Sequence, residues 1–209
     1  LCLLGSGVVV NPEGILGEID GLESRGISCD MLRIDPRAHV IMPWHLVLDG
    51  LSEKMRGKSE IGTTKKGIGP CYMDKAERSG LRMYDLVHPE LFREKVLTYG
   101  TIKNRLLTDF YHEPALDLEE IIERYTACGK RLERYLADVS VLAYDALKAG
   151  KEVLFEGAQG TLLDIDYGTY PFVTSSHPVS GGVCIGSGIG PTLIDEVIGA
   201  AKSYTTRVG

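Results

Sequence analysis

Several common sequence patterns are missing from this chain of 209 residues. No apolar run approaches the roughly eighteen residues that a membrane helix needs, so we expect no transmembrane segment. The five cysteines are scattered and never spaced as C-x-x-C, which is typical of reduced thiols in a cytoplasmic protein and argues against a disulfide framework or a zinc site. Basic residues are not in excess, because the formal net charge is −6. This charge argues against a general nucleic-acid or anionic-membrane surface.

The two ends of the chain also lack familiar signals. The chain starts with the apolar residues Leu1–Leu4, and neither a methionine nor a basic stretch precedes them, so this start does not have the pattern of a signal peptide. Residues 203–209 follow without a closing element. We therefore expect the chain to be a piece of a longer protein.

The first part of the sequence alternates between strand and helix patterns. Residues 3–10 have a glycine-interrupted strand pattern, and Asn11 and Pro12 then provide an N-cap and a first helical residue. Apolar residues follow at helical spacing as far as Gly26, which is placed as a C-cap. Short strands are expected within 27–34 and 38–42, and Pro43 begins a second helix. This alternation predicts an α/β fold with a mainly parallel sheet flanked by helices.

A helical segment follows and interrupts the α/β pattern. A short helix is predicted at 72–78, and long helical patterns cover 86–111 and 116–149, with the last helix at about 139–147. We interpret residues 86–150 as a helical insertion within a single domain that spans residues 1–209. After the insertion we expect a buried strand at Val153–Phe155, and an apolar helix face after Pro191 formed by Leu193, Ile194, Val197, Ile198 and Ala201.

Two stretches have the chemistry of a phosphate site. Residues 62–69 contain two hydroxyls, two lysines and three glycines, which offer donors, positive charge and close backbone approach. This stretch is not a Walker A loop, and a solvated basic loop remains an alternative. The second stretch, 153–191, joins the expected strand to Thr174-Ser175-Ser176 and to five glycines among residues 181–191. Open α/β sheets bind ligands beyond such strand ends, although tight surface turns would have a similar composition.

In these stretches the sequence resembles the adenylosuccinate synthetase family. The similarity is carried by 61–64 with 67–70, followed by Asp74, Lys75 and Arg78; by 155–166 with 168–176; and by 186–191. The resemblance covers the whole chain but only about the middle half of the family's length. It implies a P-loop-NTPase-like fold, here in part, and a ligase of purine biosynthesis that acts as a homodimer in the cytoplasm. GTP phosphorylates O6 of IMP, and L-aspartate then displaces the phosphate at C6.

The resemblance implies that this chain holds most of the IMP site. Thr64 and Thr174 correspond to hydroxyls that bind the IMP phosphate, Gln159 to the amide that contacts the purine and supports the catalytic aspartate, and Val208 to a backbone contact near the ribose. Arg78 corresponds to an arginine that reaches the IMP of the neighbouring subunit; the alternative is a surface arginine paired with Glu77 or Asp74.

Other parts of the family's site lie outside this chain. The catalytic aspartate and histidine, the Mg²⁺ ligands, and the guanine-binding and aspartate-binding segments have no counterpart here, so we expect no metal ligand in the chain. No histidine sits in a matching context, and we expect each to be structural or exposed. Two local differences, at Lys65-Lys66 and at 177–180, affect loop detail.

Two alternatives to part of the enzyme stay open on sequence alone. The chain could be a truncated, non-catalytic module that binds a nucleotide or a partner subunit. A native reading frame about twice as long, with a glycine-rich phosphate loop upstream, would favour the enzyme. A generic phosphate-binding α/β protein is less consistent with residues 155–176.

Overall fold

The computed structural model describes residues 1–57, 62, 64–204 and 206. Its strands form two parallel pairs: β1 (Cys2–Leu4) with β3 (Leu32–Ile34), and β2 (Val9–Val10) with β4 (His39–Val40). Leu4 lies opposite Ile34, and Val10 lies opposite Val40. Helix α1 (Pro12–Glu23) connects the first strands to the second ones, which confirms the predicted α/β alternation.

The local signals at both ends of α1 act as predicted. The Asn11 side chain accepts a hydrogen bond from the amide of Gly14 at 3.0 Å, and Pro12 is the first helical residue. At the other end Gly26 has a φ of +77°, and the amide of Ile27 donates to the Leu22 oxygen at 3.1 Å. This is the Schellman pattern, in which a left-handed residue turns the chain away from the helix axis.

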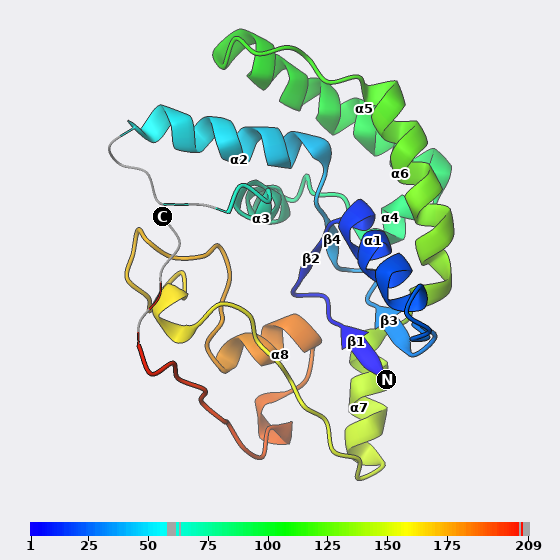
Figure 1. Cartoon of the computed structure of the whole chain (residues 1–209), viewed down its shortest axis with the longest axis vertical. Coiled ribbons are helices and arrows are strands. Elements are labelled where there is room, and N and C mark those ends of the chain that lie inside the picture. The colour runs from blue at the N-terminus through cyan, green and yellow to red at the C-terminus, as the bar shows by residue number, and fades with distance from the viewer. Residues whose placement is uncertain (58–61, 63, 205, 207–209) are drawn as a thin grey trace.

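The next two helices are neighbours and cross each other (Figure 1). Helix α2 (Pro43–Arg56) begins at the predicted proline and buries Trp44 and Leu48. Helix α3 (Ile68–Glu77) begins four residues before the predicted start at Tyr72 and ends next to Arg78, its C-cap. The short helix α4 (Met83–Leu86) follows and is buried at Met83 and Leu86.

The predicted helical insertion is present, and its helices contribute part of the main core cluster. It contains α5 (Pro89–Arg105), a π-helical turn (Leu106–Phe110), α6 (Leu118–Leu132), a 3-10 turn (Glu133–Tyr135) and α7 (Val139–Lys148). The rings of Phe92 and Tyr125 stack with their centroids 6.4 Å apart, and the Tyr125 hydroxyl donates to the Ile41 oxygen at 3.2 Å. Helices α5 and α6 therefore pack against the α/β part through their apolar faces. Within the described residues, no helix has the length and apolar character needed to cross a membrane.

Two predictions for residues after 150 are wrong. Val153–Phe155 is not a strand, and Leu154 is 85% exposed. After a 3-10 turn at Pro191–Leu193 the apolar helix face does not form either, and Val197 and Ile198 are exposed. Both patterns need a surface to cover them, because a lone strand has no ladder partner and a short isolated helix is marginal in water. In the described part of the chain no strand pairs with residues 153–155, and both segments are only partly covered.

Close contacts between glycine backbones hold this last region against the turn between β1 and β2. Helix α8 (Gly181–Ser187) forms within the glycine-rich run, and the Gly7 amide donates to the Gly186 oxygen at 2.9 Å. A Cβ at Gly7 would lie 2.4 Å from the Gly186 Cα, so the two backbones touch where no side chain fits. The Tyr72 hydroxyl donates to the Gly7 oxygen at 2.6 Å, which ties this contact to α3.

Candidate functional site

The loop before α3 is attached to α2 by two carboxylates. The Gly67 amide donates to Asp49 Oδ2 at 2.9 Å, and the Gly62 amide donates to Glu53 Oε2 at 3.0 Å. Gly67 has a φ of +74°, and a Cβ there would lie 3.0 Å from the backbone of His45 and Leu46. Glycine is therefore required at this position, both for its conformation and for its close approach to α2. Thr64 lies between the two attachment points and is exposed.

A buried polar network holds α3 against its neighbours. Asp74 accepts hydrogen bonds from His45 Nε2 at 2.9 Å and from Lys103 Nζ at 2.6 Å. Burial alone would raise the pKa of Asp74, but these two partners outweigh it and lower the pKa. Burial lowers the pKa of His45, whose Nδ1 accepts from the Met42 amide at 3.0 Å. His45 is thus a structural residue, as predicted.

Arg78 lies at the opposite end of α3 from Thr64, in a left-handed conformation with a φ of +71°. It borders a cleft of about 370 Å³, which is also lined by basic side chains: Arg37, Lys75, Arg82 and Lys95. Burial, with Lys75 and Arg82 nearby, lowers the pKa of His39 in this cleft to about 4. Since α3 has ten residues, the two ends of the helix are roughly 15 Å apart. Thr64 and Arg78 therefore lie towards opposite ends of α3.

The suggested surface pairing of Arg78 with Glu77 or Asp74 is not what the structure has. Arg78 Nε donates to the backbone oxygen of Glu77 at 3.4 Å. The Glu77 carboxylate accepts from the Ser79 hydroxyl at 2.8 Å, and Asp74 is engaged by His45 and Lys103. Within the described part of the chain, the exposed guanidinium of Arg78 therefore forms no ion pair with Glu77 or Asp74.

Residues 160–177 form a compact turn around a buried carboxylate. Asp164 Oδ1 accepts from the amides of Asp166 and Tyr167, each at 3.0 Å, and Oδ2 lies 3.3 Å from His177 Nδ1. Burial opposes ionisation, but these partners together lower the pKa of Asp164. Thr174 is fixed in the same turn, because its amide donates to the Leu163 oxygen at 2.8 Å.

The turn brings Thr174 to the end of α3 that follows Thr64. The Ser175 hydroxyl lies 3.5 Å from the place where a Cβ on Gly69 would be, and Gly69 is in the first turn of α3. The turn that contains Thr174 thus contacts the first turn of the helix that follows the Thr64 loop. Gln159 lies on a separate exposed turn, and within the described part of the chain no hydrogen bond joins it to Thr64 or Thr174. Val208 is outside the described residues.

Among the described residues, Gln159 is one of four non-glycine residues with a positive φ, at +56°. Such conformations are costly for a residue with a Cβ and concentrate at functional sites. Gln159 and its neighbours Ala158 and Gly160 are all exposed.

One group of side chains in the described residues could offer three ligand atoms to a metal. Asp164, Asp166 and His177 place such atoms within 4.8 Å of one another. Magnesium prefers oxygen ligands in an octahedral arrangement, whereas this group includes an imidazole and a buried carboxylate that already accepts from two amides. The group does not fit magnesium, and we assign no metal to it.

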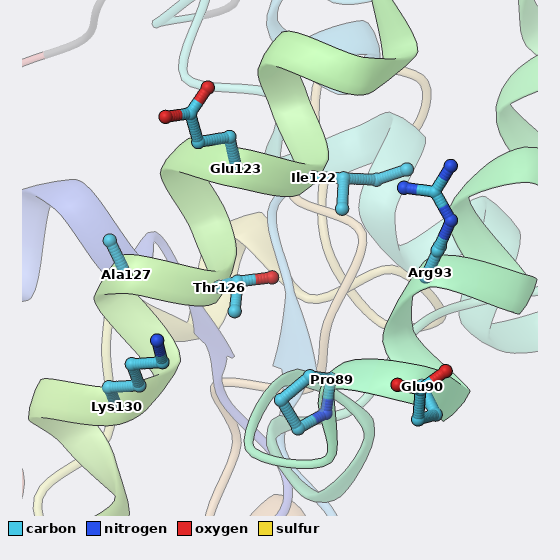
Figure 2. Close-up of a pocket in the computed structure, with 8 residues that line it drawn as sticks. All are labelled: Pro89, Glu90, Arg93, Ile122, Glu123, Thr126, Ala127 and Lys130. Atoms are coloured by element: carbon cyan, nitrogen blue, oxygen red, sulfur yellow. The ribbon is translucent and has the colours of Figure 1, made fainter.

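A second cavity lies between α5 and α6, away from these residues (Figure 2). It measures about 470 Å³ and is lined by Pro89, Glu90 and Arg93 on one helix and by Ile122, Glu123, Thr126, Ala127 and Lys130 on the other. Arg93 forms an ion pair with Glu119, with 2.7 Å between Nη2 and Oε1. None of the predicted site residues lines this groove, so it is not the candidate site.

Sequence reasoning missed Asp49 and Glu53. The clear pattern in this part of the sequence is the apolar helix face formed by Trp44, Val47, Leu48, Leu51 and Met55. Two acidic residues one helical turn apart, beside an apolar face, were the available signal. Their partners are backbone amides of a loop, which no residue pattern identifies.

Comparisons with known proteins agree with this geometry. The family model described as adenylosuccinate synthetase matches residues 1–209. The chain is 52% identical to adenylosuccinate synthetase of Thermoanaerobacter sp. (strain X514) over 209 residues, which is 100% of this chain and 49% of that protein. It is 56% identical to the protein of that name from Clostridium kluyveri, covering 99% of this chain and 49% of the relative.

A solved structure is also similar. Fully ligated adenylosuccinate synthetase from Plasmodium falciparum matches with a TM-score of 0.89 at 36% identity, over 99% of this chain and 48% of that one. The chain thus spans about half the length of the relatives it matches. Because the family model and these relatives extend over the whole of the chain, the chain belongs to the adenylosuccinate synthetase family.

Proposed function

We propose that this chain is part of a GTP-dependent ligase that joins IMP and L-aspartate to form adenylosuccinate, and that it contributes most of the IMP site. The observation that carries the proposal is the contact between the turn that contains Thr174 and the first turn of α3, the helix that directly follows the Thr64 loop. Hydroxyl donors and the amides at a helix N-terminus suit a phosphate dianion. Lys65 and Lys66, both exposed beside Thr64, add positive charge.

Gln159 is proposed to bind the purine. A glutamine side chain has both a donor and an acceptor and can therefore match a purine edge. Its left-handed conformation supports this role, because the conformation presents the side chain outward from an exposed turn. Val208 is proposed as the backbone contact near the ribose, on family resemblance alone.

Arg78 is proposed to bind the IMP phosphate of a second subunit in a homodimer. The length of α3 supports this, because it separates Arg78 from the Thr64 loop by roughly 15 Å, too far for both to hold one phosphate in one subunit. An arginine fork suits a phosphate, and the neighbouring Lys75 and Arg82 give its surroundings the same sign of charge.

The proposed reaction has two steps. GTP phosphorylates O6 of IMP, and the amine of L-aspartate then displaces the phosphate at C6. Magnesium would neutralise charge during phosphoryl transfer when bound, but the described residues do not form a site that fits it. This chain's own contribution is to bind and orient IMP. The five free cysteines support a cytoplasmic location.

Calorimetry with IMP and with inosine tests the proposed IMP site. IMP should bind more tightly than inosine, and Thr64→Val or Thr174→Val should weaken IMP binding about tenfold, since each removes a charge-assisted hydrogen bond. Gln159→Ala should cost less, and should weaken inosine and IMP equally. Equal affinity for inosine and IMP in the unaltered chain would contradict the assignment.

A further inference from the structure

We propose that Asp49 is a positioning residue, which together with Glu53 fixes the loop that carries Thr64 so that its hydroxyl meets a phosphate. The inference rests on the phosphate role proposed above for Thr64. It assigns a function to two buried carboxylates on α2 that are not themselves part of the IMP site.

The two carboxylates hold both ends of the loop. Asp49 and Glu53 are four residues apart, so they lie on one face of α2, and they are 4% and 5% exposed. Asp49 accepts from the Gly67 amide and Glu53 from the Gly62 amide. Thr64 therefore lies between two residues, Gly62 and Gly67, whose amides are both bonded to α2, and that helix is anchored in the core by Trp44 and Leu48.

The arrangement is costly unless the loop is in place. A buried carboxylate without donors loses its hydration energy, and Asp49 is buried. The Gly67 amide offsets this cost by donating to Asp49 Oδ2. The carboxylates are also unsuited to touching a phosphate themselves, because like charges repel. Their influence on a phosphate must pass through the loop backbone.

Of the two carboxylates, Asp49 gives the sharper test of the proposal, because its partner is the buried Gly67 amide. The Asp49–Gly67 bond is buried and lies directly before the first residue of α3. Gly67 lies so close to the backbone of His45 and Leu46 that a Cβ would not fit without a shift. Without the Asp49 acceptor this amide would be buried and unpaired, which favours a different loop conformation.

Hydrogen exchange and calorimetry on this chain test the proposal together. In Asp49→Ala the Gly67 amide should exchange at least about tenfold faster, as expected when a charge-assisted hydrogen bond is lost. IMP affinity should fall about tenfold while inosine affinity stays unchanged. Asp49→Asn, which keeps one acceptor oxygen, should recover most of both effects. Lys54→Ala, an exposed change on the same helix, should alter neither.

A double-mutant cycle separates positioning from general stability. If Asp49 acts through Thr64, then Asp49→Ala should cause no further loss of IMP affinity in a Thr64→Val background. Unchanged exchange at Gly67, an equal loss for IMP and inosine, or full additivity with Thr64→Val would each overturn the inference. If Thr64→Val alone leaves IMP affinity intact, the phosphate role of Thr64 fails instead, and the positioning role falls with it.

Discussion

Residues 1–148 and residues 149–206 bury their apolar side chains to different extents. In the first region Trp44, Phe92 and Tyr125 are fully buried, and the main core cluster lies between Val10 and Tyr135. In the second region Leu154, Tyr167 and other large apolar side chains are mostly exposed. The first region is stabilised by its own core, while the second is held by backbone hydrogen bonds, glycine contacts and the turn around Asp164. The candidate site lies where the two regions meet.

The largest effect expected from this division concerns catalysis. The chain alone should not form adenylosuccinate, because family resemblance places the catalytic aspartate, the metal ligands and the guanine pocket outside it, and losing such groups costs many powers of ten in rate. The assay combines the chain with IMP, GTP, L-aspartate and Mg²⁺, with IMP binding as the control for folding. Turnover at an ordinary enzyme rate of about 1–10³ per second would show that the chain is sufficient.

Truncating one large side chain in each region compares their cores directly. Phe92→Ala should lower the free energy of unfolding by about 3–5 kcal/mol, because it opens a cavity in a packed core. Leu154→Ala removes an exposed side chain and should change it by less than about 0.5 kcal/mol. Denaturant unfolding of both variants provides the measurement. A loss of similar size at Leu154 would mean that the second region has a core of its own.

Acid should weaken the first region through His39. The folded-state pKa of His39 is about 4 and its unfolded value is about 6.5, so the unfolded chain binds the extra proton between these pH values. The stability contribution is fully present above pH 6.5 and is lost as the pH falls towards 4, by up to about 3 kcal/mol.

Substitution isolates the contribution of His39. His39→Gln should flatten the decline in the free energy of unfolding between pH 6.5 and pH 4, whereas His88→Gln removes an exposed imidazole and serves as the matched control. Denaturant unfolding across this pH range gives the comparison. An undiminished decline in His39→Gln would assign the acid sensitivity to other groups.

The smallest expected effect is on the contact between the regions. Gly7→Ala would place a methyl group 2.4 Å from the Gly186 Cα and should cost about 1–3 kcal/mol in docking of the second region. Proteolysis within 149–206 should accelerate several-fold, while the unfolding of the first region changes little. Gly17→Ala, in α1 with no atom within 4 Å of the new methyl, is the control and should be neutral or slightly stabilising.

The division also explains which features were predictable from the sequence. Asn11, Pro12, Gly26 and Pro43 act through their own backbone chemistry, so their roles were visible in the chain. The helical insertion was equally clear, since its apolar residues recur at helical spacing and face a core within the same region. The strand at 153–155 and the helix after Pro191 failed, because an apolar pattern becomes structure only where another surface covers it.

The candidate site was predictable in part. Residue type and family resemblance identified Thr64 and Thr174, and in the structure the Thr64 loop precedes α3 while the turn that contains Thr174 contacts its first turn. Their binding roles, like those of Gln159, Arg78 and Val208, stay predictions. The spacing of Asp49 and Glu53 is visible in the sequence, but their partners could not be found from it, because those partners are amides that every residue except proline possesses.

Helix α3 begins four residues after Thr64 and ends directly before Arg78, two predicted phosphate contacts. In the proposed homodimer its length would therefore set the spacing between two IMP sites, one in each subunit. One added residue would lengthen the helix by about 1.5 Å and rotate everything beyond it by about 100°. The hydrogen bonds of Asp74 with His45 and Lys103 hold α3 in place, and in that dimer they would also set the direction of Arg78 towards the second subunit.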